Sequence, residues 1–162
     1  MLRDLPSYLS YLDRIRQRTL AVIDRIPDDQ FEWTPRAGEF TVGDLVRHLC
    51  AIEQMNMDAA LGKGWHYGGH RASVWGATRA AARENLVRVH DESTTKLRAA
   101  GDAMLKVPQP DLRGNPTPAW RMLMATIEHE VHHRSQLAFY LTLLDVPPPQ
   151  IFGIREEELP VD

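Results

Sequence analysis

The sequence has very little of several features that would direct its interpretation elsewhere. It contains a single cysteine, Cys50, so no disulfide can form within the chain, and a reducing compartment is expected. It has no long apolar run, and charged residues interrupt each short apolar stretch near the N-terminus, so neither a signal peptide nor a membrane span is expected there. We therefore expect a cytoplasmic protein without a membrane partner, in which Cys50 is a small buried core residue.

The chain also lacks an excess of positive charge. Its 19 Lys and Arg residues are outnumbered by 22 Asp and Glu residues, which gives a formal net charge of −3 at pH 7. Because the basic side chains are scattered among the acidic ones and form no stripe, nucleic acid is not expected as a partner. Hydrophobic residues make up 43% of the chain, enough to bury a core, and residues 1–162 are expected to form a single domain.

Helical periodicity, by contrast, is abundant. Apolar residues recur at three- and four-residue steps in four segments, and no strand-like alternation persists. The predicted helices cover about residues 3–26, 41–61, 73–101 and 117–146. The proline-rich stretch 107–118 is predicted to be irregular, and residues 146–162 are expected to form an extended tail. This pattern predicts an all-α protein, a four-helix bundle.

Two of the predicted helices have recognisable starts. Thr41 is followed three residues later by Asp44, which approximates a capping box. Thr117 is expected to cap the last helix, with Pro118 in a first turn that does not need the missing N–H.

Two histidines of the last predicted helix lie four residues apart. His129 and His133 therefore project about 40° from each other, on the stripe that should face the core. Neutral imidazoles in a core need hydrogen bonds, and two protonated ones would repel each other. One metal ion satisfies both lone pairs, so this pair indicates a metal site.

A third histidine also faces inward. His48 lies between Leu45 and Ile52 of the second predicted helix, three and four residues from these core positions. Three imidazoles from two helices would leave a coordination position open, as in catalytic metal sites. The sequence thus predicts that His48, His129 and His133 bind a divalent transition metal, and imidazole ligands suit both zinc and nickel.

The remaining histidines are not predicted ligands. His132 projects from another face of its helix, where a subunit contact or a surface role is favoured. His66 and His70 belong to a predicted loop, where solvent exposure is expected although the loop could fold over the site. His90 is expected at the surface of the third predicted helix.

Residues 129–133 also spell HEVHH, which fits the zincin protease motif H-E-x-x-H. A zincin needs a third ligand, usually an acidic residue or a histidine downstream, and Glu156, Glu157 or Glu158 could be proposed, although they follow three prolines in a tail. Zincins commonly hold peptide substrates on a sheet, and no convincing strand is predicted. The bundle hypothesis with His48 as third ligand fits better, and it gives Glu130 a structural role.

Two stretches of the sequence resemble the DinB/YfiT-like family of proposed metalloenzymes. FEWTPRAGEFTVGDLVRHLCAIE looks like the family's connector and second helix, and HEVHHRSQLAFYL looks like its HxxxH-containing fourth helix. The resemblance extends to about residue 150 and implies an up-down-down-up bundle, frequently a homodimer. It also implies zinc or nickel held by the residues that match the family's ligands, His48, His129 and His133.

The resemblance implies less about the reaction, because family members with assigned chemistry include thiol-dependent S-transferases and a mycothiol-dependent isomerase. The first hypothesis is a metal-dependent enzyme that activates a low-molecular-weight thiol for attack on an electrophilic small-molecule substrate, a detoxification step. The second is a metal-dependent hydrolase that activates water for attack on an ester or amide. The third is a stress-related bundle that binds a metal or ligand without turnover.

Overall fold

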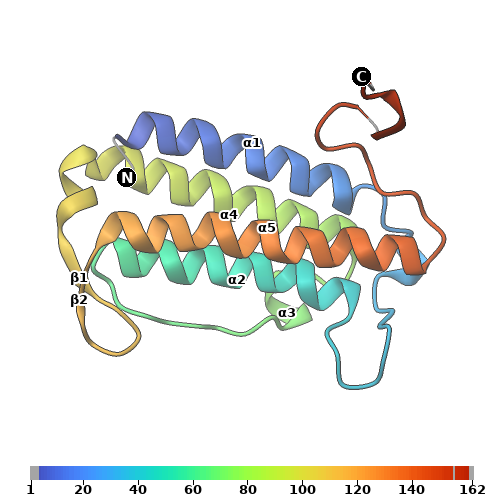
Figure 1. The fold of residues 1–162 in the computed structure, drawn as a ribbon. Helices are drawn as coiled ribbons and strands as arrows, with labels where there is room; N and C mark the ends of the chain where they lie inside the picture. Colours follow the sequence, from blue (N-terminus) through green and yellow to red (C-terminus); the bar gives the residue numbers. More distant parts are fainter. Residues whose placement is uncertain (1–3, 155, 161–162) are drawn as a thin grey trace.

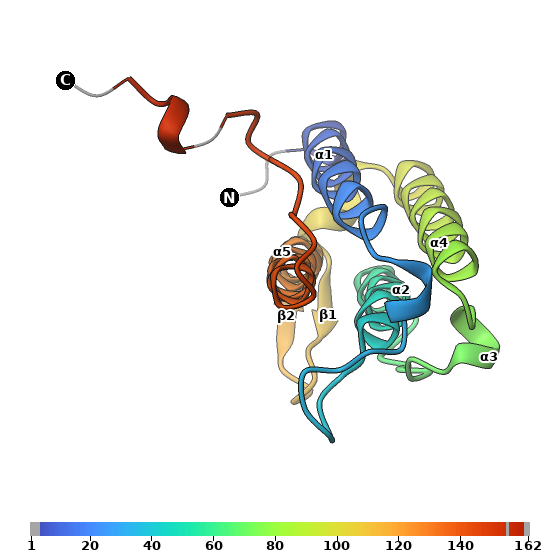
Figure 2. The ribbon, with the colours of Figure 1, turned by 90° about the vertical axis from the view of Figure 1, so that its right-hand side faces the viewer.

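The structure, a computed structural model, describes residues 4–154 and 156–160. Four long helices build it: α1 (Leu5–Ile23), α2 (Val42–Ala60), α4 (Arg79–Ala100) and α5 (Ala119–Leu143). Helices α1 and α5 run in one direction, and α2 and α4 run in the other (Figure 1). In the view along the bundle (Figure 2), α2 lies between α4 and α5, and α1 lies above α2 and α5 and beside α4. The predicted all-α bundle with up-down-down-up order is confirmed.

Two apolar clusters fill the bundle, one toward each end. The first includes Leu45, Leu86 and Leu137, which come from three different helices. The second includes Leu12 of α1 and Leu97 of α4. Each fully buried leucine contributes about 1.5–3 kcal/mol relative to an exposed one. Cys50 is fully buried in the first cluster, as predicted.

The third predicted helix, 73–101, is interrupted, so its prediction as one continuous helix was wrong. A single turn, α3 (Ala72–Trp75), ends at Gly76, whose φ of 106° lies in the region that favours glycine. Thr78 then caps α4 by accepting a hydrogen bond from the Ala81 N–H. A Cβ added to Gly76 would lie 2.5 Å from Ala82 N, so the break also needs glycine for space.

The stretch 107–118, predicted to be irregular, forms a small antiparallel hairpin of β1 (Pro108–Pro110) and β2 (Pro116–Pro118). Only alternate residue pairs of an antiparallel ladder exchange N–H···O bonds. Each proline faces another proline, and Gln109 faces Thr117, so the residues that have N–H groups occupy the bonded pair. Thr117 therefore belongs to β2, and the prediction that it caps α5 was wrong.

Other boundaries shift by a few residues. The predicted start of the first helix, Arg3, lies outside the described residues, and α1 ends at Ile23, before the predicted residue 26. The capping box of Thr41 and Asp44 is present at the start of α2, as predicted. Short 3-10 turns add η1 (Asp28–Gln30), η2 (Asp102–Lys106) and η3 (Glu156–Glu158), the last within the predicted extended tail. Of the helices in the described ranges, none combines the length and apolar character that a membrane crossing needs.

A buried ionic cluster lies between the helices, toward the middle of the bundle. Arg16 of α1 is 2% exposed, and its Nη2 donates hydrogen bonds to Glu53 of α2 and, at 2.9 Å, to Glu130 of α5. His90 of α4 joins the cluster, with Nδ1 3.3 Å from Glu53 Oε1 and Nε2 2.7 Å from Asp13 Oδ1. The cluster therefore connects all four long helices.

The surface position predicted for His90 was wrong, because its side chain is buried. His90 lies four residues after Leu86 and seven before Leu97, so it shares the inward face of α4 with these leucines. Burial alone would lower the pKa of His90, but the hydrogen bond and charge of Glu53, together with Asp13, raise it overall above the ordinary value of 6.5.

This raised pKa predicts how stability depends on pH. Protonated His90 stabilises the folded chain fully below pH 6.5, and this contribution should be lost as pH rises through the raised pKa. Urea unfolding of chelator-treated protein at successive pH values above 6.5 should show a falling free energy of unfolding. His90→Gln keeps a hydrogen-bonding side chain without the charge and should flatten this fall. Identical pH profiles for both proteins would contradict the assignment.

Candidate metal centre

Two neighbouring helices bring three histidines together. His48 comes from α2, and His129 and His133 come from successive turns of α5. The Nε2 atom of His129 lies 3.1 Å from Nε2 of His48 and 3.1 Å from Nε2 of His133. One ring nitrogen from each histidine lies within 4.8 Å of the other two. The structure thus brings together the three histidines that the sequence singles out, hereafter the triad.

The spacing of these nitrogens fits one small cation. With metal–nitrogen bonds of about 2.1 Å, two ligand nitrogens lie about 3.0 Å apart at a right angle and about 3.4 Å apart at the tetrahedral angle. The 3.1 Å separations fall between these values. Both separations measured from His129 therefore suit zinc or nickel.

The triad is uncharged at neutral pH. Burial, with the charges of His133 and His70, lowers the pKa of His48 to about 4. Burial, with the charges of His133 and His48, lowers the pKa of His129 to about 3. Burial also lowers the pKa of His133. Neutral imidazoles are the form that binds metal.

The hydrogen bonds around His133 leave its inner nitrogen in need of a partner. His133 Nδ1 donates to Gln136 Oε1 at 2.5 Å, so Nε2 presents a lone pair toward His129. Nε2 of His129 lies 3.1 Å from the Nε2 atoms of both His48 and His133, but it can form a hydrogen bond with only one of them, which leaves the other contact without a hydrogen bond. A cation would satisfy all three lone pairs at once.

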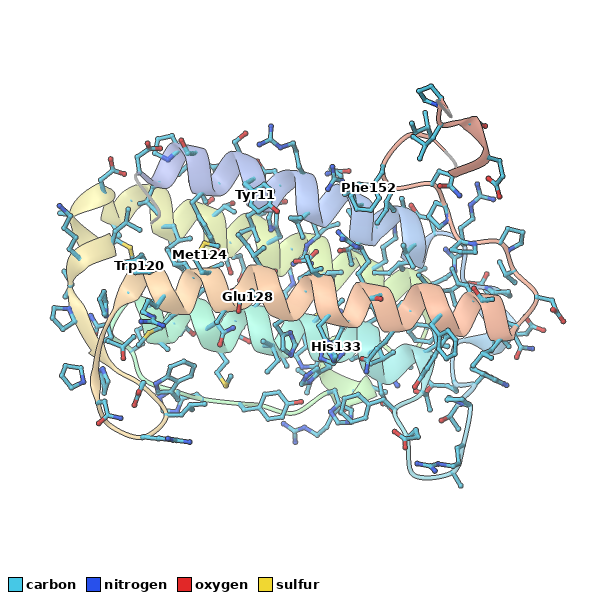
Figure 3. The ribbon with its side chains drawn as sticks, in the orientation of Figure 1. Tyr11, Trp120, Met124, Glu128, His133 and Phe152 are labelled. Atoms are coloured by element: carbon cyan, nitrogen blue, oxygen red, sulfur yellow. The ribbon has the colours of Figure 1, made fainter. Side chains whose placement is uncertain are left out.

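The site remains accessible from one side. His48 and His129 are partly exposed, whereas His133 is buried between α5 and α2 (Figure 3). Only the three histidines form the candidate cluster within the described residues, so a fourth position is left for water or substrate.

The other histidines have separate places. His132 is exposed and stands beside the triad, its ring centroid 4.9 Å from that of His133. His66 is exposed, and its Nε2 lies 3.1 Å from Lys63 O. His70 is different, because its loop packs beside His48 and places the His70 ring centroid 6.1 Å from that of His48.

Two outer partners were missed by the sequence analysis. Gln136 could have been found, because it lies three residues after His133 on the same face of α5. Tyr67, whose hydroxyl lies 2.8 Å from His48 Nδ1, gave no signal, because its position depends on the path of a loop.

The zincin interpretation of HEVHH does not fit this arrangement. The Glu130 carboxylate is 2.9 Å from Arg16 Nη2 in the buried ionic cluster. Among the described residues, no acidic side chain joins the triad, and the third histidine comes from upstream. Glu130 therefore has the structural role that helical phase predicts.

Comparison with known proteins gives a consistent picture. The family model of the DinB superfamily matches residues 11–137. A DinB-like protein from Bacillus cereus ATCC 10987 is 18% identical, with a TM-score of 0.81 over 94% of this chain and 100% of that chain. A DinB-like protein from Bacillus subtilis is also 18% identical, with a TM-score of 0.71 over 90% of this chain and 96% of that chain. These two likenesses show the fold alone, and no curated protein matches the chain.

Proposed function

The chain belongs to the DinB superfamily, and we propose that it is a metal-dependent enzyme that activates a low-molecular-weight thiol for transfer to an electrophilic small molecule. In this proposal His48, His129 and His133 hold one zinc or nickel ion. One observation carries the proposal: three uncharged imidazole nitrogens converge on a point that is accessible from one side.

A divalent ion at this point would lower the pKa of a thiol or a water molecule bound at its open position. The three neutral imidazoles add no negative charge, so the full positive charge would act on the substrate atom. Gln136 accepts a hydrogen bond from His133 Nδ1, the ring nitrogen that faces away from the metal position. The rings of His48 and His129 are partly exposed, so a substrate could reach the metal from their side.

The surroundings favour a thiol over water as the activated group. Ester or amide hydrolysis needs a proton donor for the leaving group, and Glu130 is committed to Arg16. Burial raises the pKa of Tyr67, so its hydroxyl gives up its proton less readily to a leaving group. A metal-bound thiol would lose its proton to solvent, and the thiolate would then form the new carbon–sulfur bond as the leaving group departs as an anion that needs no proton donor, such as a halide.

The proposal predicts thiol turnover that depends on the triad. Metal-loaded protein should consume at least one pair from a panel of thiols and electrophiles about tenfold or more faster than its His48→Ala variant does, because the variant lacks one ligand. Loss of free thiol is the measurement. His66→Ala, which removes an exposed histidine outside the triad, should keep the full rate.

Two outcomes would contradict the thiol proposal. Equal rates of thiol loss for the metal-loaded protein and His48→Ala across the whole panel would favour a protein that binds a metal or ligand without turnover. Metal-dependent turnover of an ester and amide panel, without thiol consumption, would identify a hydrolase.

A further inference from the structure

One loop runs beside the triad, on the side of His48. After α2 ends, residues 61–71, hereafter the strap, run back along α2 to reach α3 (Figure 1). Two tryptophan hydrogen bonds fix the strap, one on each side of Tyr67. Trp65 Nε1 donates to Pro110 O at 2.7 Å, and Trp75 Nε1 donates to Gly69 O at 2.8 Å. Tyr67 lies between these two anchors, so its position over α2 is fixed by hydrogen bonds at both ends.

The Tyr67 hydroxyl lies between two imidazoles. It is 2.8 Å from Nδ1 of His48 and 3.1 Å from Nδ1 of His70. The His70 ring packs against the Phe40 ring, with 4.6 Å between the ring centroids, and His70 Nε2 lies 3.9 Å from Asp44 Oδ1. A line of polar groups thus leads from Asp44, at the start of α2, through His70 and Tyr67 to the triad.

The protons along this line can be assigned if His48 binds metal through Nε2. Neutral His48 then carries its proton on Nδ1 and donates it to the Tyr67 oxygen. Tyr67 has one proton of its own, which it can donate to Nδ1 of His70. His70 in turn carries its proton on Nε2, the nitrogen that faces the Asp44 carboxylate. The two hydrogen bonds of the Tyr67 hydroxyl therefore run in one direction, away from the triad, whereas Asp44, at 3.9 Å, is too far from His70 for a third.

We propose that Tyr67 is a positioning residue, which with His70 behind it holds His48 in the tautomer and orientation needed for ligation. This inference rests on the proposed metal function of the triad. Tyr67 contacts Nδ1 of His48, and Gln136 contacts Nδ1 of His133. Each therefore binds the ring nitrogen that faces away from the metal position. Outer partners of this kind orient ligand histidines, and their loss typically costs about 10–100-fold in metal affinity.

The test compares two tyrosines of matched exposure. Tyr67 is 46% exposed, and Tyr11, on α1 away from the triad, is 43% exposed (Figure 3). In a chelator competition with zinc, Tyr67→Phe should bind about tenfold more weakly than the unmodified protein, while Tyr11→Phe should bind equally well. His70→Ala should cause a smaller loss, because Tyr67 would keep its contact with His48.

A spectroscopic measurement separates positioning from a general loss of structure. In the cobalt-substituted protein, proton NMR in water detects the ring N–H groups of ligand histidines as strongly shifted exchangeable signals. Tyr67→Phe should weaken one such signal, that of His48 Nδ1–H, because the proton loses its acceptor and exchanges faster with water. The signal of His133, which donates to Gln136, should be unchanged.

The outcomes distinguish this inference from the metal proposal. If Tyr67→Phe binds zinc as tightly as Tyr11→Phe and keeps every exchangeable signal, Tyr67 does not position His48, and the triad still stands as a metal site. If the unmodified protein binds neither zinc nor nickel, the metal function falls, and the role of Tyr67 falls with it.

Discussion

Arg16→Met is expected to lower the free energy of unfolding by about 3–5 kcal/mol, the usual cost of removing one partner from a buried ion pair. The Arg16 side chain is 2% exposed, and its guanidinium is bound by two carboxylates with side-chain exposures of 1% and 3%. Methionine would fill much of the space but leave Glu53 and Glu130 as buried negative charges, offset only in part by His90 beside Glu53 and by Arg134 near Glu130. Urea unfolding followed by circular dichroism measures the difference.

The matched control is Arg14→Met, because Arg14 is an exposed arginine of the same helix. Its free energy of unfolding should stay within about 0.5 kcal/mol of that of the unmodified protein. Adding Glu53→Gln and Glu130→Gln to Arg16→Met should restore part of the loss, since the buried charges are then removed. A loss below about 1 kcal/mol for Arg16→Met would show that the cluster contributes little to stability.

The helices and the triad were predictable because both depend on residues close together in sequence. Helical phase alone places His129 and His133 on one side of α5, and the same rule turns His48 toward the interior of α2. The capping box at Thr41 is likewise a contact across three residues. Only the meeting of α2 with α5 required the bundle topology, which the family resemblance supplied.

Features that depend on contacts across the bundle could not be predicted in the same way. Arg16 lies four residues after Leu12, so helical phase turns it inward, unlike exposed Arg14, but phase alone does not show which groups neutralise its buried charge. Its burial depends on Glu53 and Glu130, which arrive from two other helices. Tyr67 depends in the same way on the path of the strap. The break at Gly76 was missed because apolar spacing continues across it.

The second large effect concerns His129, the histidine in contact with both other members of the triad. His129→Ala leaves one ligand on each of two helices, with no ring nitrogen between them. Its zinc affinity should therefore fall by more than the roughly 100-fold that loss of an outer partner can cost. Chelator competition measures this fall. His132→Ala, which removes an exposed histidine of the same helix, should bind zinc as the unmodified protein does.

The most direct test of the central claim is elemental analysis of protein purified without added metal. The unmodified chain and His132→Ala should each carry about one zinc or nickel ion per chain, while His48→Ala, His129→Ala and His133→Ala should carry almost none. Metal retained by all three triad variants, or metal absent from the unmodified chain even after incubation with zinc and nickel, would contradict the account.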